Sequence, residues 1–231
     1  MNKKIRVGAL ISGGGTNLQA IIDASRAGAI DADLVFVGSD NPAAKGLERA
    51  RRHGLSDWLV DYAAILRACR QDPGKVRPPE DFQLEDIRDK QAIFPPSADR
   101  NRVDPYLTSR AVAEARLLKA MPPDSFDLLV LAGFMRNLTP YFIDRVNKDR
   151  ARPRIMNIHP ALLPAFPGTD GYGDTFRYGC KVAGCTVHFV DYGEDSGPII
   201  GQRAFAVYED DTLESIRRRG LEQEWQLYPE C

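Results

Sequence analysis

The sequence contains few of the residues that build metal sites, disulfides or nucleic-acid surfaces. It has only four cysteines in 231 residues and no Cys-x-x-Cys pair, so neither a zinc site nor a disulfide framework is indicated. Its 31 basic and 32 acidic side chains leave a net charge of -1, which excludes a broad basic field for nucleic acid or an anionic membrane. No apolar run approaches the roughly 18–20 residues that span a bilayer. We therefore expect a cytoplasmic protein without a nucleic-acid or membrane partner.

The rest of the composition is that of a chain able to bury a substantial core. Hydrophobic residues make up 43% and charged residues 27% of it, which are ordinary values for a globular protein. The basic start and apolar stretch of residues 1–11 superficially suggest a signal peptide. The apolar part is short, however, and runs into a glycine loop rather than a cleavage site, so we interpret it as a first strand. The length suits a single domain over residues 1–231.

Short apolar runs alternate with helical patterns along most of the chain. We expect strands at Ile5–Ile11, 34–37, Leu128–Leu131, Ile155–His159, 187–190 and Ile199–Ala206, with 34–37 and Leu128–Leu131 buried. We expect helices directly after residue 17, at 46–53, at 139–146 and at 212–227. This order of elements predicts an α/β fold with a Rossmann-like doubly wound, mostly parallel sheet.

The segment 69–105 interrupts this alternation. It is rich in proline and charge and contains only a short amphipathic piece near residues 82–87. We interpret it as an inserted excursion, either a lid or an oligomer contact. A solvated loop without catalytic duty is an equal alternative.

Residues 12–17, with the sequence Ser-Gly-Gly-Gly-Thr-Asn, join the first expected strand to a helix. Such a glycine-rich turn exposes backbone N–H groups to an anion, and the helix dipole adds to the attraction. Leu18 stands where a dinucleotide loop has its last glycine, and the lysine of a P-loop is missing. A small monophosphate therefore fits better than a dinucleotide or a triphosphate. The alternative is a tight turn that needs glycine only for its backbone.

The most informative stretch is Asn157-Ile158-His159-Pro160. Residues two apart on a strand point the same way, so Asn157 and His159 project together where Pro160 ends the strand. Open α/β sheets bind ligands at such strand ends. An amide N–H can stabilise an oxyanion, and an imidazole can move a proton near neutral pH. The alternative for His159 is a buried histidine satisfied by the backbone.

Asp195 is the expected third member of this group. A carboxylate beside a histidine orients the ring and favours its protonated form. The alternative interpretation of Asp195 is a residue that serves only a turn, since Asp-Ser-Gly-Pro also suits a turn. Because no serine or cysteine stands at a convincing nucleophile elbow, the group indicates direct attack by a substrate amine rather than a covalent acyl-enzyme. We expect His188, in the middle of a strand, to be structural.

Several matching pieces together resemble the folate-dependent phosphoribosylglycinamide formyltransferase family. They are ISGGGTNLQAII, GLERARRHGL, LVLAGFMRNLTPYFI, NIHPALLPAFPG and GCTVHFVDYGEDSGPII. The resemblance covers residues 5–54 and about 127–229. It implies formyl transfer from 10-formyltetrahydrofolate, as co-substrate and without a metal, to the amine of glycinamide ribonucleotide. The implied partners are these small molecules, and the implied assembly is a monomer or homodimer.

The resemblance also implies a role for individual residues, carried over by position. The ribonucleotide phosphate would bind to Gly13, Gly15, Thr16 and Asn17. The folate pteridine would be lined by Met135, Arg136, Leu138 and Ile143, with backbone groups pairing to its edge. Asn157, His159 and Asp195 would be catalytic. Glu224 would bind the ribose hydroxyls.

The chain departs from the family pattern in the segment 69–105, in residues 169–174, and at its end, where relatives continue with another strand. Residues 169–174 stand where the family has a histidine-containing mobile loop. Three other functions compete with formyl transfer to the ribonucleotide. They are hydrolysis of 10-formyltetrahydrofolate, formylation of methionyl-tRNA, and folate or nucleotide binding without catalysis. A regulatory N-terminal domain would favour the hydrolase, and a basic C-terminal domain would favour the methionyl-tRNA formyltransferase. An altered 169–174 loop favours the third.

Overall fold

The computed structural model describes residues 4–72, 77–122, 124–149 and 151–231. Its sheet has seven strands in the order β3-β2-β1-β4-β5-β6-β7. The strands are β1 (Ile5–Ile11), β2 (Ala32–Ser39), β3 (Ser56–Leu59), β4 (Leu128–Leu131), β5 (Ile155–His159), β6 (Val182–Phe189) and β7 (Ile199–Ala206). The helices are α1 (Thr16–Arg26), α2 (Gly46–Arg52), α3 (Tyr62–Gln71), α4 (Leu84–Lys90), α5 (Arg100–Ala120), α6 (Pro140–Val146), α7 (Gly171–Tyr178) and α8 (Leu213–Glu230).

The sheet is mostly parallel, as the sequence predicts. Strand β1 pairs in parallel with β2 and β4, and β2–β3 and β4–β5 are parallel as well. Strands β5–β6 and β6–β7 pair antiparallel. The strand order reverses at β1, because the chain runs outward from β1 to β3 and then resumes on the other side at β4. In open α/β sheets the carboxyl ends of the strands at such a switch point form the ligand crevice.

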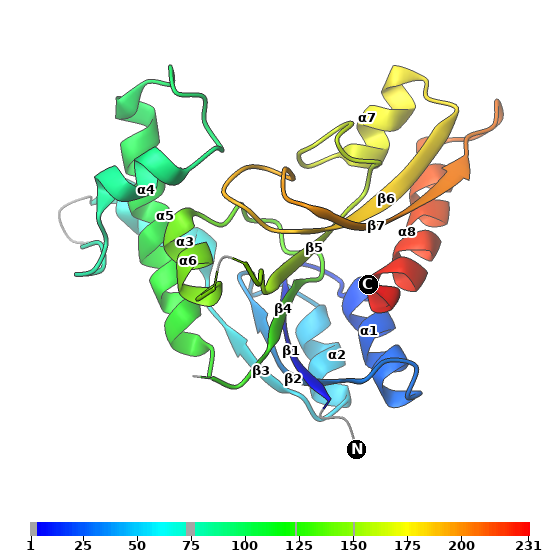
Figure 1. Cartoon of the computed structure of the whole chain (residues 1–231), viewed down its shortest axis with the longest axis horizontal. Helices are drawn as coiled ribbons and strands as arrows, with labels where there is room; N and C mark the ends of the chain where they lie inside the picture. The colour runs from blue at the N-terminus through cyan, green and yellow to red at the C-terminus, as the bar shows by residue number, and fades with distance from the viewer. Residues whose placement is uncertain (1–3, 73–76, 123, 150) are drawn as a thin grey trace.

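Helices cover both faces of the sheet (Figure 1). On one face α1, α2 and α8 pack over a core that includes Ile11, Leu18 and Val187. On the other face α3, α5 and α6 enclose a second core that includes Phe36 and Phe142. Both cores are built from fully buried strand residues, which is why the strands read as continuous apolar runs. No helix within the described ranges is both long enough and apolar enough to cross a membrane.

The predicted strands are confirmed, with β2 and β6 longer than expected at their ends. For the segment 69–105, the alternative of a solvated loop is wrong for the part that the structure describes, because α4 and the start of α5 lie in it, and its interpretation as an insertion stays a prediction. Residues 73–76 of that segment lie outside the described residues. Helix α5 contains Pro105, yet it continues because Val103, Leu107 and Ala111 are buried at helical spacing. Packing of that face offsets the roughly 3 kcal/mol that an interior proline costs.

Three further elements were not expected from the sequence, namely α3, α7 and β3. Helix α7 occupies the stretch interpreted as a loop with Gly171 and Gly173, and it buries Tyr172 and Thr175. It ends at Gly179, which has a φ of 80° and so adopts the left-handed conformation that favours glycine. Strand β3 is a short edge strand of four residues, which gives little periodic signal.

Candidate active site

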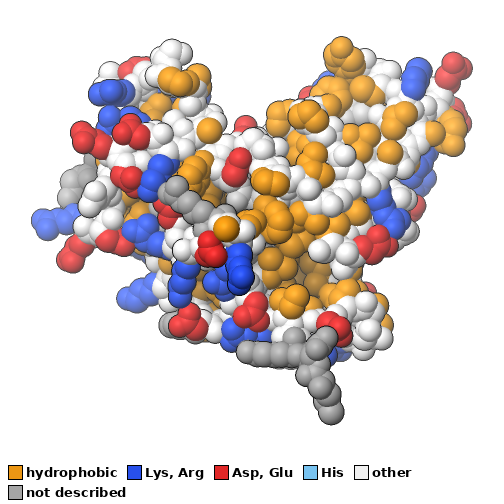
Figure 2. Space-filling model, viewed as in Figure 1, with side chains coloured by type: hydrophobic (Ala, Val, Ile, Leu, Met, Phe, Trp, Pro, Cys, Tyr) orange, Lys and Arg blue, Asp and Glu red, His pale blue; other side chains and the backbone are white. Residues whose placement is uncertain are grey.

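A cavity of about 550 Å³ lies at the switch point of the sheet. Figure 2 shows the surface hollowed between the lobe that carries α4 and α5 and the lobe formed by α7, β6 and β7. The cavity is lined by the loop after β1, the stretch after β4, the end of β5, the start of α7, the loop between β6 and β7, and one face of α8. Segments far apart in the sequence therefore meet at the strand ends.

The glycine loop presents its N–H groups to the cavity because its carbonyl groups form hydrogen bonds with residues on the other side of the loop. The carbonyl oxygens of Ser12, Gly13 and Gly14 accept hydrogen bonds from the Asn41 side chain at 2.8 Å, the Gly46 backbone at 3.0 Å and the Arg49 side chain at 2.8 Å. This fixed backbone turns the loop amides and the start of α1 toward the space in front. Gly13 and its neighbours through residue 17 line the cavity.

Gly15 begins helix α1 from the left-handed region, with a φ of 70°. A Cβ at this position would meet the Cα of Gly46 at 2.8 Å, so glycine is required by both conformation and space. No side chain of the described chain caps this helix start. The first-turn N–H groups near Thr16 and Asn17 are thus placed to receive an anion.

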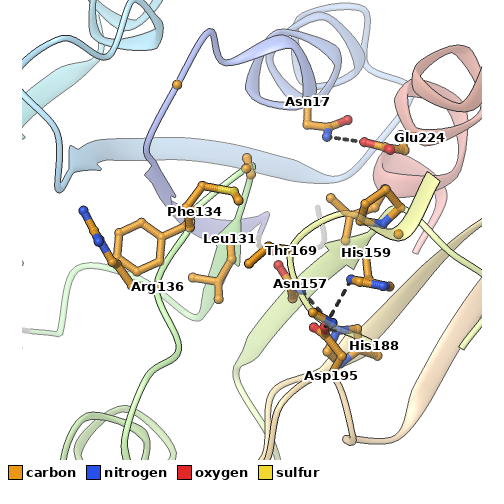
Figure 3. Close-up of a pocket in the computed structure, with 18 of the residues that line it drawn as sticks. Asn17, Leu131, Phe134, Arg136, Asn157, His159, Thr169, His188, Asp195 and Glu224 are labelled. Carbon is orange, nitrogen blue, oxygen red and sulfur yellow. Dashed lines mark hydrogen bonds and ion pairs between the residues drawn. The ribbon is translucent and has the colours of Figure 1, made fainter. Parts of the chain in front are cut away.

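The three predicted catalytic residues line the same cavity (Figure 3). Asn157 and His159 come from β5, and Asp195 comes from the loop between β6 and β7. Nδ1 of His159 lies 3.2 Å from Oδ2 of Asp195. Nδ2 of Asn157 lies 3.2 Å from Nε2 of His188, which in turn lies 3.5 Å from Oδ1 of Asp195. The expected convergence of amide, imidazole and carboxylate is present, with a second imidazole between two of them.

Both ring nitrogens of His159 face oxygen acceptors. Nε2 lies 2.7 Å from the carbonyl oxygen of Phe166, and Nδ1 faces Asp195. A backbone carbonyl and an ionised carboxylate can only accept, so both contacts are hydrogen bonds only when both nitrogens carry protons. The ring is buried, with 2% of the residue exposed. The contact of Nε2 is with a backbone carbonyl alone, as expected for a histidine that is only structural. The carboxylate at Nδ1 is a further contact, and it makes the His159–Asp195 pair suited to charge stabilisation and proton transfer.

Asp195 is held as a carboxylate although it is partly buried. Burial by itself raises its pKa, but the hydrogen bond from His188, the charge of His159 and the Gly168 amide together lower the pKa below its ordinary value. The Gly168 N–H donates to Oδ2 at 2.8 Å. The backbone of Asp195 has a φ of 50°, a conformation that is uncommon for residues other than glycine. Asp195 is therefore both a turn residue and a residue of the site, so the two interpretations of it are compatible.

His188, interpreted from the sequence as structural, lines the cavity and contacts two of the predicted catalytic residues. Strands β5 and β6 pair Asn157 with His188, so both side chains lie on the same face of the sheet. Nδ1 of His188 lies 2.9 Å from the carbonyl oxygen of Phe189, so this nitrogen carries a proton. Nε2 then either accepts from Asn157 or donates to Asp195. The ring holds the other two side chains in place, and only the strand register reveals this.

Glu224 and Asn17 meet at the other end of the cavity. The Asn17 side chain donates to Oε2 of Glu224 at 2.7 Å, and the hydroxyl of Tyr172 donates to Oε1 at 2.7 Å. Burial raises the pKa of Glu224, and these two hydrogen bonds oppose the shift. Oδ1 of Asn17 is buried without a hydrogen-bond partner among the described residues. This end of the cavity therefore contains polar groups with capacity left to bind a ligand.

The expected folate residues divide into those that line the cavity and one that does not. Met135, Arg136 and Leu138 line it, whereas Ile143 lies on α6, is buried in the second core and is not among the residues that line the cavity. Nε of Arg136 lies 2.5 Å from Oδ2 of the fully buried Asp40. The guanidinium of Arg136 thus binds within the protein, and its backbone is the part available to a ligand.

Residues 169–172 line the cavity, and residues 171–174 belong to the start of α7 rather than to a separate loop. Asp170 precedes α7 and pairs with Arg177 at 2.9 Å and with Arg217 at 2.8 Å. Arg217 and Tyr172 also line the cavity, although the sequence reading assigned neither to the site. Tyr172 follows from no local signal, because only the packing of α7 against α8 brings it to Glu224.

The fold and this site together define a group-transfer enzyme of the formyl transferase class. Residues 5–231 match the family described as formyl transferase. A phosphoribosylglycinamide formyltransferase of Bacillus subtilis is 34% identical over 218 residues, which cover 94% of this chain and 88% of that protein. The crystal structure of glycinamide ribonucleotide transformylase 1 from Symbiobacterium toebii is similar, with a TM-score of 0.72 and 39% identity. It covers 100% of this chain and 86% of that one. The chain belongs to the phosphoribosylglycinamide formyltransferase family.

Some relatives are much longer. The trifunctional purine biosynthetic protein adenosine-3 of Drosophila melanogaster is 34% identical over 229 residues, which cover 98% of this chain but 14% of that protein. This chain therefore corresponds to one part of that relative and to most of the bacterial one.

Proposed function

We propose that this protein transfers the formyl group of 10-formyltetrahydrofolate to the amine of glycinamide ribonucleotide in purine biosynthesis. The observation that supports it most is a cavity that joins the uncapped start of helix α1 to the amide of Asn157, the buried imidazole of His159 and the carboxylate of Asp195. A phosphorylated amine and an acyl donor bound at the two ends would meet at this group. The family membership of the chain supports the same reaction.

The nucleotide is expected at the end formed by α1 and α8. Its phosphate would accept hydrogen bonds from the loop of Gly13, Gly15, Thr16 and Asn17, where the dipole of α1 adds to the attraction. Each carboxylate oxygen of Glu224 accepts one hydrogen bond within the protein and can accept another from a ribose hydroxyl. The free Oδ1 of Asn17 is a further acceptor there.

The folate is expected at the end formed by the stretch after β4. Met135 and Leu138 offer apolar surface, and the backbone at Arg136 can pair with the polar edge of a pteridine. A cavity of about 550 Å³ lies in the size range of small-molecule sites. The co-substrate supplies an activated formyl group, and the residues around the cavity bind and orient it.

The chemistry needs stabilisation of negative charge and the movement of one proton. When the amine attacks the formyl carbon, a new carbon–nitrogen bond forms and negative charge develops on the formyl oxygen. The amide of Asn157 would donate a hydrogen bond to that oxygen and stabilise the charge. The bond to the folate nitrogen then breaks, and the proton lost by the amine goes to that nitrogen. The His159–Asp195 pair, with Nδ1 3.2 Å from Oδ2, can take part in this proton movement.

A steady-state assay with both substrates tests the proposal. Release of tetrahydrofolate, followed by absorbance, should depend on the presence of glycinamide ribonucleotide. Release at the same rate without the amine would show a hydrolase instead. Binding of both ligands, measured by calorimetry, without any release would show a binding protein that lacks catalysis.

A further inference from the structure

The loop that carries Asp195 is ordered partly by its own side chains. It runs from the end of β6 to the start of β7 and lines the cavity. Within it, Oδ1 of Asp191 accepts from the hydroxyl of Ser196 at 2.7 Å and from the Gly193 N–H at 3.1 Å. The positive φ of Asp195 is a strained conformation that persists only where the surroundings hold it.

A second support comes from a distant part of the chain. The N–H of Ala92, directly after α4, donates to the carbonyl oxygen of Tyr192 at 2.9 Å. A Cβ at Gly193 would lie 3.7 Å from the Cβ of Ala92, so the two segments are in contact there. In Figure 1 the loop between β6 and β7 extends from its own lobe toward α6 and α5. The end of α4 thus touches the catalytic loop near its middle.

Charged and polar side chains strengthen the same contact. Nζ of Lys90, the last residue of α4, lies 2.9 Å from Oδ2 of Asp144 on α6. The hydroxyl of Tyr192 donates to Oδ1 of the same carboxylate. Asp144 therefore joins Lys90 to Tyr192, three residues before Asp195 in the chain. Lys90 and Asp144 are each about a quarter exposed, so solvent screens this pair only in part.

Helix α4 is itself fixed to the body of the protein. Its Ile87 is buried with Leu107 of α5 and Tyr141 of α6 in a separate apolar cluster. Arg88 of α4 pairs with Asp104 of α5 at 3.0 Å. A rigid helix anchored in this way can hold a neighbouring loop in one position.

We propose that Lys90 and Tyr192 are positioning residues for Asp195, acting through Asp144 from the segment of α4. This inference rests on the proposed function only for its kinetic consequence. It assigns to the segment around α4 the task of keeping the catalytic carboxylate at His159. It also gives a role to the contact between this segment and the loop that carries Asp195.

Two variants and one matched control test the inference. Lys90→Met keeps the aliphatic stem and removes the charge, and Tyr192→Phe removes only the hydroxyl. Lys90→Met removes the pair with Asp144 and also a pair with Asp86 within α4, at 2.7 Å. Arg88→Met is the control for lost charge on α4, because Arg88 pairs with Asp104 of α5 and not with the loop. Lys90→Arg should retain the interaction. Each variant is compared with the parent protein for kcat, for KM of the ribonucleotide and for thermal midpoint.

The first two variants should lower kcat about tenfold, with KM for the ribonucleotide unchanged, because its expected binding residues lie at the α1–α8 end. Arg88→Met and Lys90→Arg should stay near the parent kcat. An equal loss of kcat in Lys90→Met and Arg88→Met would overturn the inference, since it would show general loosening of α4.

Amide hydrogen exchange of the free protein gives a readout that does not depend on activity. The Gly168 N–H is bonded to Asp195, so its exchange rate reports whether the carboxylate is in place. Exchange at Gly168 should rise at least about threefold in Lys90→Met and Tyr192→Phe but not in Arg88→Met. An unchanged rate in the first two would refute positioning even if transfer is observed. A raised rate in a protein without transfer would support positioning and reject the proposed reaction.

Discussion

At the scale of single residues, the site depends on how each polar atom is satisfied. The carboxylate of Asp195 receives the Gly168 N–H and faces two histidines, at 3.2 Å for His159 and 3.5 Å for His188. His159 in turn binds a backbone carbonyl with its other nitrogen. These contacts fix the position of a charged pair that would otherwise prefer water.

Replacement of Asp195 by asparagine tests the charge of this pair. Asp195→Asn keeps the size of the side chain but removes its negative charge and one acceptor oxygen. We expect kcat to fall about 100-fold or more, because the negative charge that faces Nδ1 of His159 is lost from the proton-transfer pair. The circular dichroism spectrum should not change. Asp210→Asn, at an exposed position, serves as the control, and an unaltered kcat in Asp195→Asn would remove this residue from the mechanism.

Truncation of Asn157 tests oxyanion stabilisation. Asn157→Ala removes the amide that points to His188 and lines the cavity. By comparison with other oxyanion donors, the variant should lose about 3–4 kcal/mol of transition-state stabilisation. The resulting fall in kcat/KM should come from a lower kcat. A loss that appears only in KM would mean that the amide binds substrate and does not act on the transition state.

The identities of Asn157, His159 and Asp195 follow from local sequence, because strand alternation and a following proline place them at a strand end. The position of His188 could not be predicted in the same way. It depends on the antiparallel register that sets His188 opposite Asn157, and on the return of the chain that brings Asp195 back to both. Long-range pairing of this kind leaves no local pattern.

At the scale of elements, the joint between α5 and α6 contains a buried acid. Both oxygens of Glu114 accept from Thr139, the N-cap of α6, at 2.8 Å for its N–H and 2.6 Å for its hydroxyl. Burial raises the pKa of Glu114 from 4.5 to about 7, although the hydrogen bonds from Thr139 oppose the shift. The start of α6 is therefore linked to the protonation of one side chain of α5.

This raised pKa predicts a pH-dependent stability. The folded protein binds the Glu114 proton more tightly than the unfolded chain does, so the stabilisation is complete below pH 4.5 and is lost as pH rises toward 7. Relative to Glu114→Gln, the parent protein should lose up to about 3 kcal/mol of unfolding free energy across this window. Urea unfolding at several pH values measures it. Parallel pH curves for the two proteins would contradict the prediction.

The glycine loop and the start of α2 form a second element-scale contact. Gly15→Ala places a methyl group against the Cα of Gly46 and adds left-handed strain, so we expect weaker ribonucleotide binding as well as lower stability. Gly28→Ala is the matched control, since Gly28 has a φ of 68° and open space around its Cβ position. Gly28→Ala should lower the free energy of unfolding by only about 1–2 kcal/mol. Equal ribonucleotide affinity in the two variants, measured by calorimetry, would contradict the role of this contact.

Central strands and capped helices were predictable from sequence, whereas elements stabilised by distant packing were not. Strands β1, β4 and β5 read directly as mostly apolar runs, and Thr139-Pro140 marks the start of α6. Helix α5 was obscured by Pro105 and α7 by two glycines. Both form because they bury one face against neighbouring helices or β6, and that energy does not depend on local propensity.

At the scale of the whole molecule, the switch point of the sheet determines where the site lies. The doubly wound order places the glycine loop after β1 beside the stretch after β4, and the antiparallel β5–β6 pair brings Asp195 to the same edge. One end of the resulting cavity carries the groups suited to a phosphate and a ribose. The other end is formed by the stretch after β4. The sequence predicts this sheet, but the contact of the segment after α4 with the loop of Asp195 follows only from the folded chain.

The central claim is that the formyl group moves to the amine of the ribonucleotide within this cavity. The most direct test follows the carbon itself, with 10-formyltetrahydrofolate labelled with ¹⁴C in the formyl group, glycinamide ribonucleotide, and either the parent protein or Asp195→Asn. The label should appear in the nucleotide product with the parent protein and far more slowly with Asp195→Asn. Label released as formate, or retained on the folate while both ligands are bound, would contradict the claim.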